Sequence, residues 1–69
     1  MIVRLELPGG SYLWVNTLRI ETISTEDVRD ISTSVHEYLK SPAVVVLVGG
    51  ERIYTATPVR DLLSRLNVL

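Results

Sequence analysis

The feature that most constrains this chain is the run AVVVLV, Ala43 to Val48, followed directly by Gly49-Gly50 and the segment RIYTAT. The run is β-branched almost throughout, which favours a strand buried on both faces. Glycine accepts positive φ, so the Gly-Gly pair predicts a turn. In the returning segment, Ile53 and Thr55 share one face, while Arg52 and Tyr54 share the other. The sequence therefore predicts a hairpin whose first strand is central in a sheet.

A second hairpin is predicted at the N-terminus, around the turn PGGS. Alternation in the first strand separates two sets of side chains, Val3, Leu5 and Leu7 on one face and Arg4 and Glu6 on the other. In the second strand, Leu13 and Val15 oppose Tyr12 and Trp14 in the same way. The segment TLRIETIS, residues 17–24, predicts a third short strand, with Leu18 and Ile20 on the face opposite Ile23.

Two segments carry helical signals. In residues 24–42, Val28, Ile31, Val35 and Leu39 recur at helical spacing, after a cap at Ser24 or Thr25 and before Pro42, which favours a helix. A strand is the alternative for this segment, because ISTSV is poor in helix formers and also fits a period of two. The second helix is predicted from Thr57 as N-cap and Pro58 as first residue. Its apolar stripe is formed by Val59, Leu62, Leu63 and Leu66.

These elements predict one domain, residues 1–69, of the α+β class. Its order is β-β-β-α-β-β-α: a small antiparallel sheet of two hairpins and a short strand, with two helices packed on one face. A core in 69 residues offsets the chain entropy only narrowly. The chain has no cysteine and one histidine, His36, which excludes disulfides and argues against structural zinc. We therefore expect association with another chain, and a homo-oligomer first; a marginal monomer is the alternative.

Charge and hydropathy narrow the classes of partner. The net charge is −1 and the arginines are scattered, whereas nucleic-acid binders usually carry a basic surplus. No apolar run approaches the ~18 residues of a membrane span, and no secretory signal precedes the first strand. The expected location is the cytoplasm.

The sequence offers no constellation that predicts catalysis, a cofactor or a metal site. His36 is a lone histidine with no orienting acid. The pairs Gly9-Gly10 and Gly49-Gly50 lie between strands and lack the spacing of phosphate-binding loops. The acids Glu26, Asp27 and Asp30 suit the first turn of a helix. The prediction is a protein that is not an enzyme.

Aromatic and arginine side chains on the strands are the candidate interaction residues: Arg4, Tyr12, Trp14, Arg52 and Tyr54. If the helices cover one face of the sheet, these side chains lie on the open face. Tyrosine, tryptophan and arginine are enriched at protein interfaces. The alternative is that the rings cover part of the core.

The order of several short motifs gives a further indication of function. The positions Met1-Ile2, Gly10, Val15-Asn16, Ile20-Glu21-Thr22-Ile23, Gly50 and residues 59–66 follow a recognisable order. In this order the chain resembles the small flagellar and swarming-motility proteins of the FlbD/SwrD type, over about two thirds of its length. Residues 26–41 would be an insertion relative to that family. The resemblance implies a non-enzymatic protein that binds a partner, and it designates no catalytic residue.

The function predicted first is thus a small non-catalytic protein-interaction module, an adaptor or regulator, with a motility role implied by the resemblance alone. One alternative is a viral or mobile-element protein that binds a host protein. Another is a single-stranded nucleic-acid binder that uses Arg4, Tyr12 and Trp14 as a stacking platform.

Overall fold

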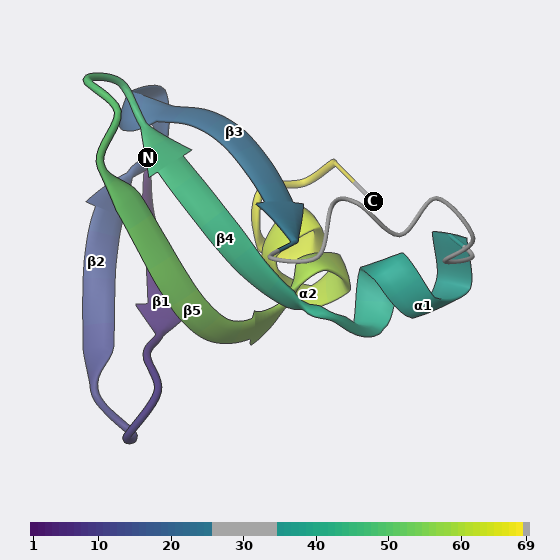
Figure 1. Ribbon diagram of the computed structural model, residues 1–69. Helices are drawn as coiled ribbons and strands as arrows, with labels where there is room; N and C mark the ends of the chain where they lie inside the picture. The colour runs from purple at the N-terminus through teal and green to yellow at the C-terminus, as the bar shows by residue number, and fades with distance from the viewer. Residues whose placement is uncertain (26–34, 69) are drawn as a thin grey trace.

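The computed structural model describes residues 1–25 and 35–68. Its elements are, in chain order, β1 (Ile2–Glu6), β2 (Tyr12–Asn16), the 3-10 helix η1 (Thr17–Arg19), β3 (Ile20–Thr25), α1 (Val35–Lys40), β4 (Pro42–Leu47), β5 (Arg52–Pro58) and α2 (Val59–Arg65). The α+β class and the predicted order of strands and helices are confirmed (Figure 1). All strand pairs are antiparallel.

The five strands are divided between two sheets. β1 and β2 form one, and β3, β4 and β5 form the other in that order. The two hairpins therefore do not join into a single sheet. Where β1 approaches β5, the two strands are joined by a side chain and not by backbone pairing. The Glu6 N–H of β1 donates to the Thr57 hydroxyl of β5 at 3.0 Å.

Both hairpins close with the same turn, as their shared Gly-Gly pairs suggested. The Leu7 N–H donates to the Ser11 carbonyl at 2.8 Å, and the Leu7 carbonyl accepts from the Gly10 N–H at 3.2 Å. In the second hairpin the Leu47 N–H donates to the Glu51 carbonyl at 2.8 Å, and the Leu47 carbonyl accepts from the Gly50 N–H at 2.9 Å. The first glycine of each pair has φ of +94° or +106°, a conformation that L side chains rarely adopt.

β4 is the central strand of the three-stranded sheet, as predicted. Ala43 and Val45 are fully buried, and Val44 and Leu47 nearly so. Val44 and Val45 point to opposite faces and both are buried, so the strand is covered on both faces at this point, as predicted, which explains its continuous apolar run. On β5, Thr55 is buried while Arg52 and Tyr54 are exposed, which confirms the predicted alternation.

The third strand begins later than its sequence indicated. Thr17–Arg19 form η1, and Asn16 caps it, because the Asn16 side chain accepts the Leu18 N–H at 3.1 Å. Leu18 is consequently exposed and not on a strand face. The register with β4 then shifts between Ile20 and Thr22, so Ile20 and Ile23 both pack against the core instead of facing opposite ways.

The helices differ from the sequence prediction in their bounds. α1 covers only Val35–Lys40, where the structure selects helix over strand. The rest of the predicted stripe, Val28 and Ile31, lies outside the described residues, as do the acids Glu26, Asp27 and Asp30.

The prediction of Thr57 as the N-cap of the last helix was wrong. Thr57 belongs to β5 and is buried, because its hydroxyl bonds to Glu6 on β1. Pro58 occupies the N-cap position without a side-chain cap, and the first helical N–H, that of Val59, donates to the Ser41 carbonyl at 2.8 Å. The predicted stripe of α2 is confirmed, since Val59 and Leu62 are buried and Leu63 and Leu66 pack beside them.

The core lies between two layers. One is the inner face of the three-stranded sheet, and the other is formed by the β1–β2 hairpin and α2, with α1 against α2 at one end (Figure 1). Its fully or nearly fully buried members are Val3, Leu5, Val15, Ala43, Val45, Leu47, Val59 and Leu62. No helix among the described residues is long and apolar enough to span a membrane.

Candidate interaction surface

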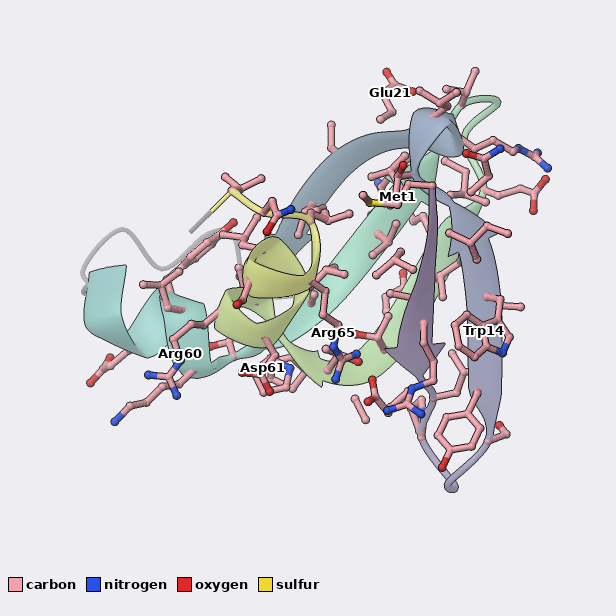
Figure 2. The ribbon with its side chains drawn as sticks, turned by 180° about the vertical axis from the view of Figure 1, so that it is seen from behind. Met1, Trp14, Glu21, Arg60, Asp61 and Arg65 are labelled. Atoms are coloured by element: carbon pink, nitrogen blue, oxygen red, sulfur yellow. The ribbon has the colours of Figure 1, made fainter. Side chains whose placement is uncertain are left out.

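The outward face of the β1–β2 hairpin brings together three of the five predicted interaction residues. Odd-numbered residues of the two strands face the core, so Arg4, Tyr12 and Trp14 face away from it. The exposed fraction is 64% for Trp14 and 59% for Tyr12. Trp14 lies at the outer margin of the molecule, away from α2 (Figure 2). We call the set Arg4, Tyr12 and Trp14 the hairpin face.

The hairpin face is ordered by contacts between its own residues. Arg4 lies directly opposite Trp14 in the ladder, and Glu6 lies opposite Tyr12. The Arg4 guanidinium carbon sits 4.8 Å from the centre of the Tyr12 ring, within the range of a cation–π contact. Arg4 Nη2 also approaches Glu6 Oε1 at 3.6 Å. The arginine therefore rests on the tyrosine ring and leaves the indole of Trp14 uncovered.

The other two predicted residues, Arg52 and Tyr54, lie on a different surface. They are on the outer face of the three-stranded sheet, where Tyr54 pairs with Val44 and Arg52 with Val46. Together with Thr22, Ser24 and Thr25 of β3, these residues line a shallow depression of about 260 Å³. The five residues are therefore brought together as two separate groups and not as one surface.

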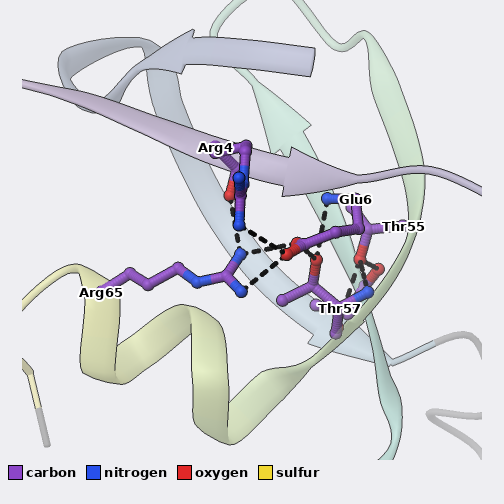
Figure 3. Close-up of polar contacts among 6 residues, drawn as sticks. Arg4, Glu6, Thr55, Thr57 and Arg65 are labelled. Atoms are coloured by element: carbon purple, nitrogen blue, oxygen red, sulfur yellow. Dashed lines mark hydrogen bonds and ion pairs between the residues drawn. The ribbon is translucent and has the colours of Figure 1, made fainter. Parts of the chain in front are cut away.

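The sequence did not reveal a third group, which lies behind the hairpin face. Arg65 of α2 donates from Nη1 and Nη2 to the two carboxylate oxygens of Glu6, at 2.6 and 2.7 Å (Figure 3). The Thr57 hydroxyl donates to Glu6 Oε2 at 2.6 Å. Arg65 Nη1 also donates to the Arg4 carbonyl at 2.9 Å. The sequence predicted Thr57 as a helix N-cap, and nothing near it in the sequence pointed to Glu6 as the partner of its hydroxyl.

These bonds fix the charge state of Glu6. The Arg65 guanidinium, followed by the Thr57 hydroxyl, lowers the pKa of Glu6 from 4.5 to about 2. The carboxylate is thus ionised near neutral pH, and both of its oxygens accept hydrogen bonds. A carboxylate so held is a poor proton acceptor, which suits a structural clamp between β1 and α2 rather than acid–base chemistry.

Potential catalytic or metal-binding groups are not gathered within residues 1–25 and 35–68. No cluster of three metal-ligating side chains occurs there, and every buried side-chain nitrogen or oxygen there has a hydrogen-bond partner. The backbone of His36 belongs to α1, while its side chain lies outside the description.

Comparison with protein-family models, curated proteins and solved structures finds no significant match to this chain.

Proposed function

We propose that this protein is a non-catalytic protein-interaction module that binds its partner through the hairpin face. The observation that carries the proposal is the 64% exposure of Trp14 beside Tyr12 and Arg4 on a fully paired hairpin. Tryptophan, tyrosine and arginine are enriched among the residues that dominate the energetics of protein interfaces. The two aromatic rings remove a large area from water at a small cost in conformational entropy.

The packing of the chain supports this assignment. The aliphatic side chains of both layers fill the core, so the aromatic rings of the hairpin face are not needed to close it. Arg4 is already held on Tyr12, which reduces the entropy that a partner must remove on binding. Because the resemblance to flagellar and swarming-motility proteins implies partner binding, the proposal extends to a partner in that apparatus.

The test is affinity capture from cells that express the protein, comparing wild type with Trp14→Ala. The matched control is Leu18→Ala, which truncates a side chain that is 83% exposed outside the hairpin face. The proposal predicts proteins retained by wild type and by Leu18→Ala and lost with Trp14→Ala. Equal retention by all three chains would contradict it.

Oligonucleotide binding is the competing outcome for an aromatic and arginine surface. A salt-sensitive change in Trp14 fluorescence on adding single-stranded DNA or RNA would favour a stacking platform. We expect no such change, because the net charge of the chain is −1.

A further inference from the structure

The backbone of β2 has one free edge, and the ladder identifies which residues form it. The hairpin's terminal hydrogen bonds join odd-numbered residues: Leu7 to Ser11 at 2.8 Å and Thr17 to Met1 at 2.9 Å. In an antiparallel ladder, hydrogen-bonded pairs alternate with pairs whose N–H and C=O groups point outward. The outward-pointing groups therefore belong to even-numbered residues, which on β2 include Tyr12 and Trp14.

The corresponding edge of β1 is closed by side chains. The Glu6 N–H donates to Thr57 Oγ1 at 3.0 Å, and the Arg4 carbonyl accepts from Arg65 Nη1 at 2.9 Å. For Tyr12 and Trp14, the described part of the chain supplies no comparable partner, since β2 pairs with β1 alone. β2 forms the outer margin of the hairpin in both views (Figures 1 and 2).

The free edge also lacks the features that usually prevent strand pairing. β2 reads YLWVN, with no charge and no proline. Leu13 is 37% exposed although it lies on the same side of the hairpin as buried Val15. By contrast β3, which also has a single neighbour, carries Glu21 and a register shift.

We propose that the free edge of β2 pairs with β2 of a second copy of this chain, in the antiparallel sense, to form a four-stranded sheet. This inference rests on the proposed function and adds a second copy of the chain as a partner, bound at the strand edge. Leu13 lies at the two-fold axis, and Tyr12 of each copy lies opposite Trp14 of the other.

The groups already free at the edge select this register. The backbone N–H of Tyr12 in one copy would donate to the C=O of Trp14 in the other copy, and the N–H of that Trp14 would donate to the C=O of Tyr12. Each proposed pair is therefore a hydrogen-bonded pair. Leu13 would meet Leu13 of the second copy on the core side, which covers its exposed surface. Tyr12 and Trp14 would form two cross-strand aromatic pairs on the hairpin face.

Charge and area set the strength of the dimer. The arginines and glutamates of the two hairpins lie on the outer strands, about 14 Å apart at the strand spacing, where salt screens their repulsion. The contact is smaller than the roughly 800 Å² per partner of a standard interface. We therefore expect a concentration-dependent dimer with a dissociation constant on the order of 10–100 µM.

Amide hydrogen exchange as a function of protein concentration tests the pairing directly. The Tyr12 and Trp14 amides should exchange quickly in dilute protein and slow by roughly fivefold when the total chain concentration exceeds the dissociation constant about tenfold. The Leu13 and Val15 amides, which bond to β1, serve as internal controls and should be protected throughout. Unchanged exchange at Tyr12 and Trp14, or concentration-dependent protection at β3 instead, would overturn the proposal.

Two variants of Tyr12 distinguish the contribution of its backbone N–H to dimerisation from that of its aromatic ring. Tyr12→Ala and Tyr12→Pro both remove the aromatic ring, but only proline removes the outward N–H; an edge strand tolerates this change. In sedimentation velocity, Tyr12→Pro should be monomeric at concentrations where Tyr12→Ala still dimerises. Equal association of the two would contradict strand pairing.

Leu13→Lys gives an independent variant if Tyr12→Pro does not fold. It places two like charges at the two-fold axis and should abolish the dimer, whereas the matched control Leu18→Lys should not. A Leu13→Lys chain that dimerises like wild type would overturn the inference. A chain that stays monomeric while Trp14-dependent capture of another protein persists would refute this pairing alone and leave the proposed function standing.

Discussion

Arg65 on α2 holds both carboxylate oxygens of Glu6 on β1, at 2.6 and 2.7 Å, and thereby ties the last helix to the first strand. The pair bridges 59 positions of the chain. It also closes the edge of β1 through the Arg4 carbonyl, which leaves β2 as the open edge of the hairpin.

Arg65→Lys should lower the free energy of unfolding by about 1 kcal/mol. Lysine keeps the charge but loses the planar fork that bonds both oxygens. Urea denaturation followed by circular dichroism measures the loss. Arg60→Lys, at an exposed position of the same helix, is the control and should stay within about 0.5 kcal/mol of wild type.

The clamp also predicts how stability depends on pH. The pKa of Glu6 is about 2 in the folded chain and is expected near 4.5 when unfolded. As the pH falls from about 4.5 towards 2, the unfolded state takes up the proton first, so stability falls in this window. The Glu6 side chain is partly exposed, with a relative accessibility of 29%, so solvent screening limits the effect to about 1–2 kcal/mol.

A Glu6→Gln chain provides the comparison for this pH effect. The difference in unfolding free energy between wild type and Glu6→Gln should shrink between pH 4.5 and 2 and be constant above that window. An NMR titration of the Glu6 carboxyl gives its pKa directly. A value near 4.5 in the folded protein would refute the clamp.

Thr57→Val should destabilise the fold more than Thr57→Ser. Valine keeps the shape but leaves a partly buried carboxylate oxygen and the Glu6 N–H without the hydroxyl, at a cost of about 1.5–3 kcal/mol. Serine keeps the hydroxyl and loses one methyl group, at about 1 kcal/mol. Thermal unfolding of the two variants decides; a serine chain less stable than the valine chain would show that the methyl group outweighs the hydrogen bonds.

Gly9→Ala should cost about 1 kcal/mol through backbone conformation alone. Gly9 has a φ of +94°, and a Cβ placed there would meet no atom within 4 Å. Replacing Gly9 by D-alanine in a synthetic chain should stabilise the hairpin, because D residues favour positive φ. Equal stability of the L and D chains in denaturant melts would contradict this reasoning.

The local parts of the fold were predictable from sequence, and the non-local parts were not. Alternation and the Gly-Gly turns placed Arg4, Tyr12 and Trp14 on one outward face, because both signals act within a hairpin. The split of Arg52 and Tyr54 onto another surface depends on which strands share a sheet. The Thr57–Glu6 contact joins residues 51 positions apart, so the local threonine–proline signal for a helix cap could not anticipate it.

The central claim is that the rings of the hairpin face serve association and not folding. Trp14→Ala should therefore leave the free energy of unfolding within about 0.5 kcal/mol of wild type, whereas Leu62→Ala, in the core, should cost about 2–5 kcal/mol. A large loss for Trp14→Ala would make the indole part of the core.

Photo-crosslinking in living cells tests this claim most directly. A photoreactive phenylalanine analogue in place of Trp14 should form covalent adducts with protein, and the same group in place of exposed Leu18 should form far fewer. Adducts with nucleic acid alone, or equal yields at the two positions, would contradict the account.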